Sequence, residues 1–228
     1  MILIKNKIAI EKMHTAGKIL AGILEEVKDL VVPGVSTLQL DSVIEQKMRK
    51  NGLLPSCKGY AGYKHATCIS LNDVIVHGVP SEKNILKSGD FVKIDVVGSY
   101  KGYCADMARY FFVGEVDSLV RKIAKVAQSA LDKAIEKAVP GNRLSDLSAC
   151  IQQEVESNGF NIVRKFTGHG IGRNMNEEPE IPNYGNFGEG PVLKEGMTLA
   201  IEPMITQGSY GVKILQDGWT AKTLDGGV

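Results

Sequence analysis

The sequence repeats itself at an offset of 107 residues, and this repeat restricts the possible folds more than any other feature. Pro33-Gly34 recurs as Pro140-Gly141, and the residues that follow match without a gap. The matched pairs in this block are Leu40 and Leu147, Ile44 and Ile151, Gln46 and Gln153, Asn51 and Asn158, and Gly52 and Gly159. A second block at the same offset pairs Leu86-Lys87 with Leu193-Lys194, Gly89 with Gly196, and Ile94 with Ile201. Two blocks at one offset predict a single duplicated α+β domain over 1–228, with helix–helix–sheet halves near 1–114 and 115–228 about a pseudo-twofold axis.

The local patterns agree with such a tandem. Apolar residues at helical spacing predict helices over residues 7–30, 119–138 and 144–158. A further helix is predicted between a cap at Ser36 or Thr37 and a stop at Asn51-Gly52. Short β-type runs follow the second helix at 66–71, 74–76, 91–98 and 103–113. The stretch 99–102 is predicted to be the turn of a hairpin that joins the last two strands.

Composition excludes several classes of protein. The 27 basic and 26 acidic side chains give a net charge of +1, so there is no electrostatic reason to expect binding to nucleic acid or to an anionic membrane. The longest apolar runs are too short to span a bilayer, and residues 1–12 lack the apolar core of a signal peptide. The four cysteines form no Cys-x-x-Cys pair, which predicts free thiols in a reducing cytoplasm.

Four residues form a candidate metal site. Asp95 and Glu202 each follow one half of the matched pair Ile94 and Ile201, so the axis relates two carboxylates inside apolar strands. Asp106 lies on the return strand of the predicted hairpin, roughly opposite Asp95. Buried carboxylates repel each other unless a cation lies between them. His169, in Gly168-His169-Gly170-Ile171-Gly172, adds an imidazole where glycines let the backbone approach a ligand. Taken singly, each acid is more often a solvated or capping residue and the histidine a loop residue, but jointly they favour Mn(II), Fe(II), Co(II) or Zn(II).

The sequence resembles type I methionine aminopeptidase, a family with the pita-bread fold. The resemblance rests on Val76-His77-Gly78-Val79-Pro80, Asp95, Asp106, the glycine-rich segment around His169, and Ile201-Glu202-Pro203-Met204. The spacings of 18, 11, 63 and 33 residues between His77, Asp95, Asp106, His169 and Glu202 agree with the bacterial form. The resemblance covers essentially the whole chain.

The resemblance implies a cytoplasmic, monomeric enzyme with two divalent ions (Co, Mn, Fe or Zn) that removes the initiator methionine from nascent chains with a small second residue. Glu202 is expected to ligate metal and to act as general base and then acid. His77 is expected to hydrogen-bond the substrate. A methionine pocket is expected from Cys57, Tyr60, Tyr63, Cys68 and Trp219. The other interpretation is that these side chains form part of an ordinary core, although sulfur and aromatic faces suit a thioether.

Two departures from the family pattern are visible. The family's second substrate-facing histidine falls at Asn176, and a neighbouring aromatic residue falls at Met175. An amide donates a hydrogen bond but cannot become a cation. The resemblance also implies one more strand with a second bridging glutamate at position 233, beyond Val228. Without that glutamate, the chain is expected to hold one ion at Asp106, His169 and Glu202.

Two other functions fit the same residues. One is a metallopeptidase like the Xaa-Pro dipeptidases, which share the fold and the types of ligand but usually carry a sizeable N-terminal domain. The other is a catalytically impaired pita-bread protein that only binds peptides, a hypothesis suggested by Asn176 and the missing glutamate. The four intact ligands favour catalysis.

Overall fold

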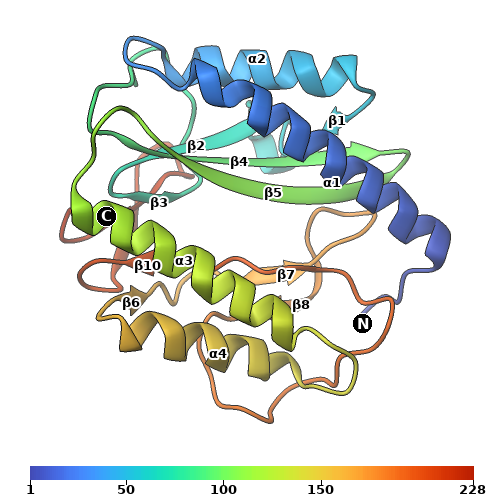
Figure 1. The fold of residues 1–228 in the computed structure, drawn as a ribbon. Coiled ribbons are helices and arrows are strands. Elements are labelled where there is room, and N and C mark those ends of the chain that lie inside the picture. Colours follow the sequence, from blue (N-terminus) through green and yellow to red (C-terminus); the bar gives the residue numbers. More distant parts are fainter.

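The computed structural model describes residues 1–228, in which two pairs of helices enclose the strands and loops (Figure 1). The helices are α1 (Lys7–Val27), α2 (Thr37–Lys50), α3 (Ser118–Lys137) and α4 (Leu144–Ser157), with 3₁₀ turns at Lys28–Leu30 and Tyr60–Gly62. The strands of the first half are β1 (Leu54–Pro55), β2 (Thr67–Leu71), β3 (Val74–Val76), β4 (Phe91–Tyr100) and β5 (Tyr103–Phe112). Those of the second half are β6 (Asn161–Ile162), β7 (Gly168–Gly170), β8 (Glu177–Ile181), β9 (Leu199–Ala200), β10 (Ile205–Thr206), β11 (Val212–Ile214) and β12 (Ala221–Thr223). No helix is long and apolar enough to cross a bilayer.

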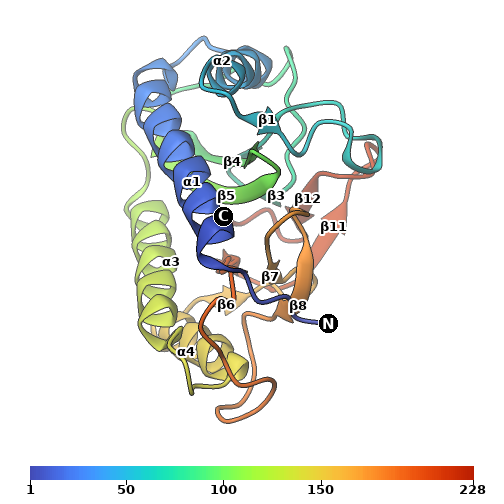
Figure 2. The ribbon, with the colours of Figure 1, turned by 90° about the vertical axis from the view of Figure 1, so that its right-hand side faces the viewer.

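The first half is a sheet covered on one face by α1 and α2 (Figures 1 and 2). In this sheet β4 pairs with β5, and also with β2 and the two-residue β1. Alternate residues of β4, among them Val92, Ile94 and Val96, point into a core of 16 buried residues that also takes side chains from both helices. The opposite alternation therefore leaves Lys93, Asp95 and Val97 on the face away from these helices.

The second half has two equivalent helices but less regular strands. Helices α3 and α4 pack on a core of 13 buried residues, and the strands near them are only two to five residues long. The predicted counterpart of the Asp95 strand is one of these short pieces. Strand β9 ends at Ala200, and Glu202 lies in the following loop, where Pro203 has no N–H for a sheet hydrogen bond.

Two isolated bridges support the repeat hypothesis. Ser36 bridges Ile85 in the first half, and Arg143 bridges Val192 in the second. Each residue of the second bridge lies 107 positions after its counterpart in the first. Helices α2 and α4 each contain 14 residues. The halves also share a sheet, because β3 of the first half pairs with β12, which in turn pairs with β11.

The hairpin forms as expected, but its register differs by two residues from the prediction. Asp95 faces Ala108, and Asp106 faces Val97, so the two carboxylates are diagonal neighbours on one face. The strands run through Tyr100 and Tyr103, and the turn consists of Lys101 and Gly102, both at positive φ. A two-residue turn of this kind fixes the register.

The glycines beside His169 allow β8 and β9 to approach β7 closely, in place of the expected close approach to a ligand. A Cβ on Gly168 would lie 2.4 Å from the carbonyl oxygen of Ala200 in β9, and one on Gly170 would lie 2.1 Å from the carbonyl oxygen of Glu178 in β8. Both contacts are with backbone, which cannot rotate away. Hence β7 fits between β8 and β9 only because these positions carry no side chain.

We predict that Gly170→Ala destabilises the protein by about 1–3 kcal/mol, because the added methyl group overpacks the β7–β8 interface. Urea unfolding followed by circular dichroism measures the change. Gly22→Ala is the matched control, since nothing lies within 4 Å of a Cβ there and the residue is inside α1. This control should be neutral or more stable by roughly 0.5–1 kcal/mol. Equal effects of the two substitutions would contradict the packing argument.

Candidate metal centre and peptide site

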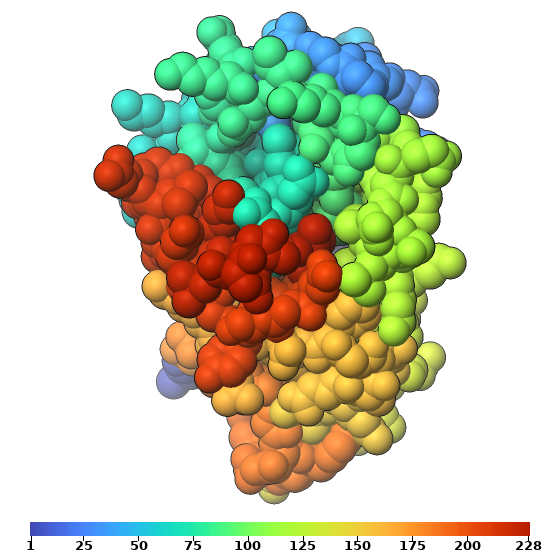
Figure 3. Space-filling view, turned by 90° about the vertical axis from the view of Figure 1, so that its left-hand side faces the viewer, coloured from blue at the N-terminus to red at the C-terminus, as the bar shows by residue number.

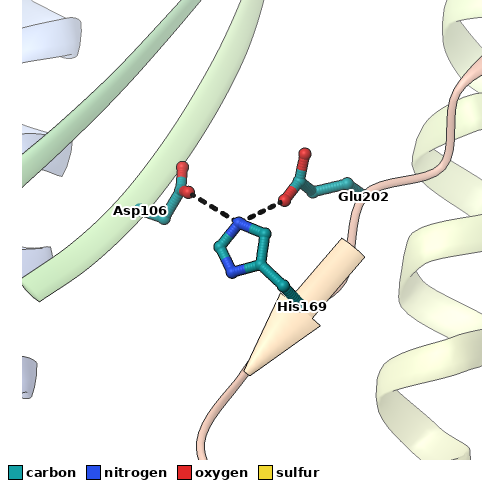
Figure 4. Close-up of side chains that lie close together, drawn as sticks. All are labelled: Asp106, His169 and Glu202. Atoms are coloured by element: carbon teal, nitrogen blue, oxygen red, sulfur yellow. Dashed lines mark ion pairs between the residues drawn. The ribbon is translucent and has the colours of Figure 1, made fainter. Parts of the chain in front are cut away.

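Three predicted ligands from three parts of the chain meet at one point (Figure 4). Asp106 comes from β5, His169 from β7, and Glu202 from the loop after β9. His169 Nε2 lies 3.2 Å from Glu202 Oε1 and 3.7 Å from Asp106 Oδ2. The ligand atoms of all three residues lie within 4.8 Å of one another.

The orientation of His169 leaves an electron pair facing the two carboxylates. Its Nδ1–H donates a hydrogen bond of 2.8 Å to the carbonyl oxygen of Gly170. In the neutral ring, Nε2 then carries a lone pair, which faces the carboxylate oxygens. A metal-bound histidine usually donates its other N–H to a backbone carbonyl or a carboxylate, as Nδ1 does here. Glu202 Oε1 is buried without a hydrogen-bond partner. Three acceptors with one unpartnered oxygen fit a divalent cation.

Asp95 adds a third carboxyl group behind this cluster. Burial raises the pKa of Asp95, and the charges of Asp106 and Glu202 raise it further. Burial and the charge of Glu202 likewise raise the pKa of Asp106 to about 8. For His169, burial alone would lower the pKa, but the neighbouring Glu202 carboxylate and the hydrogen bond to Gly170 raise it overall. Negative charge is therefore costly here until a cation or a proton compensates it.

Asn183 holds Glu202 in place, a contact that the sequence analysis did not identify. The fully buried Asn183 donates a hydrogen bond of 2.7 Å from Nδ2 to the carbonyl oxygen of Glu202. Glu202 lies outside any strand, so this bond replaces the sheet pairing that would otherwise fix its backbone. No local pattern around Asn183 distinguishes it from a loop residue.

His77 lies at the end of β3 in a strained conformation. Its φ is 58°, which is rare for a residue with a Cβ. The next residue has no room for a side chain, because a Cβ on Gly78 would lie 2.3 Å from the carbonyl oxygen of Ile69. The imidazole packs edge-on against Phe166 with ring centroids 5.4 Å apart. Burial lowers the pKa of His77, and the charge of Glu202 opposes this effect, so the neutral imidazole is favoured. Such strain is typical of functional sites.

A cavity of about 560 Å³ opens onto the acidic cluster. Its wall includes His77, Asp95, Asp106 and Glu202, together with apolar residues of α3 such as Ala127. Figure 3 shows the face on which α3, strands β2 and β3, and the C-terminal residues meet. The cluster is therefore accessible to a ligand from outside.

The five predicted pocket residues separate into a buried group and a rim. Cys57, Tyr63 and Cys68 are buried in one apolar cluster, and Trp219 packs against it, with its ring centroid 5.0 Å from that of Tyr63. Tyr60 is 46% exposed and accepts a hydrogen bond of 3.3 Å from Asn176 Nδ2. Asn176 thus lies at the rim, and Met175 packs on the cluster.

Other members of this cluster were missed. They are Val97, Cys104 and Ile171, with Met13 and Val79 packed against them. Val97 was recoverable, because it lies two residues from Asp95 on the same face of β4. Met13 was not, because nothing in the sequence of α1 distinguishes this side chain from the others of its helix.

Comparisons with known proteins agree with the geometry. Residues 11–221 match metallopeptidase family M24. A methionine aminopeptidase of Clostridium perfringens is 47% identical over 226 residues, which are 99% of this chain and 90% of that relative. The crystal structure of methionine aminopeptidase from Thermotoga maritima has a TM-score of 0.98 at 46% identity, and the match covers 100% of this chain and 91% of that one. Prolidase from Pyrococcus furiosus has a TM-score of 0.77 at 26% identity, covering 96% of this chain and 64% of that one.

The fold and the cluster of ligands define an α+β metallopeptidase with the pita-bread fold. The chain belongs to metallopeptidase family M24, as the resemblance in its sequence predicted.

We predict that the metal-free protein loses stability as the pH rises from about 4 to 8. Asp106 has a pKa of about 8 in the folded protein against 3.8 for an unperturbed group, so the folded state holds a proton that the unfolded state has released. Its contribution is present at low pH and is lost as the pH approaches 8. Added Mn(II) should offset the loss, because it compensates the same charge. Urea unfolding at about pH 5.5 and pH 8, with and without Mn(II), measures both effects.

Asp106→Asn is the control for this prediction, since an amide does not titrate. It should reduce both the pH dependence and the stabilisation by Mn(II). A Mn(II) effect of the same size in wild type and D106N would show that the ion binds elsewhere.

Proposed function

We propose that this chain removes the N-terminal methionine from nascent proteins and peptides in a metal-dependent hydrolysis. The observation that carries the proposal is the meeting of Asp106, His169 and Glu202 at one point, in a chain 47% identical to a methionine aminopeptidase. The substrates would be polypeptide N-termini as they emerge in the cytoplasm, with a small second residue preferred.

Asp95, Asp106, His169 and Glu202 are the proposed metal ligands, and two divalent ions (Co, Mn, Fe or Zn) are the proposed cofactor. When bound, such ions supply Lewis-acid polarisation of the scissile carbonyl and lower the pKa of water. The carboxylates and one imidazole match the preference of these metals for oxygen and nitrogen donors. The fit rests on the unpartnered Glu202 Oε1 and the acceptor Nε2 of His169.

Glu202 is the proposed general base and acid. Its side chain is 33% exposed, more than those of Asp106 and His169, so it is the member of the cluster that water reaches most readily. Hydrolysis requires one proton to leave the attacking water and one to reach the departing amine. A single carboxylate at the cavity wall can carry out both transfers in turn.

His77 is the proposed hydrogen-bond donor to the substrate. The lowered pKa keeps the ring neutral, so it has one N–H to donate. The strained backbone of His77 and the close contact of Gly78 with β2 hold the ring at the cavity wall. Because this geometry exists before substrate binds, little reorganisation is needed.

The cluster of Cys57, Tyr63, Cys68 and Trp219, with Tyr60 and Asn176 at the rim, is the proposed methionine pocket. Thiols and aromatic faces are favourable neighbours for a thioether. Asp217 fixes the turn that presents Trp219, because it accepts hydrogen bonds from the N–H of Trp219 and from the Thr220 hydroxyl, at 2.9 and 2.6 Å.

A second candidate function, Xaa-Pro dipeptidase activity, is favoured by the structural likeness to a prolidase. A methionyl peptide of the Met-Ala-Ser type, tested beside an Xaa-Pro dipeptide, separates the two activities. Release of methionine alone supports the proposal, release from the Xaa-Pro substrate alone supports the dipeptidase, and no release from either supports a protein that only binds peptides.

We predict that Met-Ala-Ser is cleaved at least about tenfold faster than Leu-Ala-Ser or Lys-Ala-Ser, since a shaped apolar pocket discriminates by roughly 1–3 kcal/mol. Second residues larger than valine should slow cleavage as well. Measurement of kcat/KM by amino-acid release checks both expectations. Comparable rates on all three peptides would refute the pocket assignment.

We also predict that Asn176→His raises kcat roughly tenfold with a smaller change in KM. A histidine can carry positive charge as negative charge develops on the substrate, whereas the amide only donates a hydrogen bond. The gain should be below the about 10²–10³-fold cost of removing a whole donor, because the amide already donates. Steady-state kinetics on Met-Ala-Ser provide the measurement. An unchanged or lower kcat would assign Asn176 another role.

A further inference from the structure

The N-terminal segment lies against the loop that carries Asn176 (Figure 2). The backbone N–H of Lys5 donates a hydrogen bond of 2.8 Å to the carbonyl oxygen of Gly196. The Lys5 ammonium lies 2.7 Å from Glu177 Oε2, and both side chains are only 6% exposed. In every other ion pair of the chain at least one partner is more exposed than this.

Two glycines make room for this ion pair. A Cβ on Gly172 would lie 2.5 Å from Lys5 Cε and 2.7 Å from both carboxylate oxygens of Glu177. A Cβ on Gly196 would lie 2.7 Å from the carbonyl oxygen of Lys5. Gly172 is the third glycine of the segment around His169. The metal cluster does not explain why this position carries a glycine, but the space needed by the ion pair does.

Glu177 connects this pair to the loop at the rim of the proposed pocket. Its Oε1 accepts a hydrogen bond of 3.1 Å from the N–H of Asn174, and the carbonyl oxygen of Asn174 accepts one of 3.0 Å from Gly172. Both carboxylate oxygens of Glu177 are thus engaged, one by the N-terminal segment and one by the loop. Met175 and Asn176 lie between these fixed points.

The side chains of Met175 and Asn176 face the peptide site. Met175 packs on the cluster of Cys57, Tyr63 and Cys68, and Asn176 Nδ2 contacts the hydroxyl of Tyr60. Asn176 itself is exposed, so no packing of its own holds it in place. Its position depends on the backbone of the loop, and the loop depends on Glu177.

We propose that Lys5 and Glu177 are positioning residues that hold Met175 and Asn176 against the N-terminal methionine of the substrate. This inference rests on the proposed function and assigns a role in recognition to the N-terminal segment. A buried ion pair contributes little net stability, because desolvation offsets the attraction between the charges. Its effect is to fix a geometry. Here the ion pair lies beside the residues that would contact the substrate.

A double-mutant cycle tests the inference. Lys5→Met should lower kcat/KM on Met-Ala-Ser by roughly 10–100-fold, the scale of a small misplacement at an active site. In a Met175→Ala, Asn176→Ala background the same substitution should cost less than about twofold, because Lys5 acts through the two side chains already removed. Additive losses in the cycle, or an unchanged K5M, would overturn the proposal.

Two further variants separate positioning from general stability. Lys133→Met removes the ion pair with Glu154 between α3 and α4, far from the site in sequence, and should lower stability without changing kcat/KM. Glu177→Gln keeps the size and the acceptor for Asn174, so it guards against misfolding of K5M and should show a smaller loss in the same direction. Full activity in E177Q would contradict a role for the ion pair itself.

Failure of the proposed function can be distinguished from failure of this inference. If the wild-type chain releases no methionine, the proposed function fails. The same set of variants is then compared by their affinity for L-methionine. Trp219 is the single tryptophan and packs on Tyr63 in the proposed pocket, so its fluorescence reports that binding. Positioning is supported if L-methionine binds more weakly to K5M than to wild type and if K5M causes no further weakening in the M175A/N176A background. The Mn(II) affinity of K5M should stay within about twofold of wild type. Equal binding in wild type and K5M overturns it.

Discussion

The repulsion among carboxylates at one point is the constraint on which the rest of this structure depends. Asp95, Asp106 and Glu202 approach one another beside an imidazole whose free nitrogen is also an acceptor. Burial makes this repulsion more costly, because it removes the water that would otherwise solvate the charges. The fold holds these residues together at a cost that a divalent cation offsets when it binds. Affinity for metal is thus built into the energetics of the apo protein.

Each half of the chain supplies part of the cluster in a different way. The first half places Asp95 and Asp106 on a long regular hairpin, whose pairing fixes both backbones. The second half uses short strands, and there the fixed elements are individual contacts. The carbonyl of Gly170 orients His169, and Asn183 holds the backbone of Glu202. The second half therefore depends on single hydrogen bonds, each of which a point substitution can remove.

Much of this arrangement followed from the sequence. The four helices lie where periodicity and breakers predicted them. Three of the four residues predicted as ligands, Asp106, His169 and Glu202, meet in space. The register of the hairpin was wrong by two residues, since it depends on the turn at Lys101 and Gly102. The glycines around His169 were assigned to the approach of a ligand, whereas Gly168 and Gly170 admit neighbouring strands. Contacts such as that between Lys5 and Glu177, 172 residues apart, leave no local pattern, so only the structure could show them.

The thiols beside the cluster bear on which metals the site accepts. Cys68 faces Asp95 directly across the β2–β4 pair, and Cys57 belongs to the same apolar cluster. Burial raises the pKa of both thiols, and the charge of Asp95 raises it further. A thiol binds metal well only after it loses its proton. The carboxylates that attract a hard cation thereby keep the nearby sulfur atoms protonated, so that oxygen and nitrogen remain the available donors.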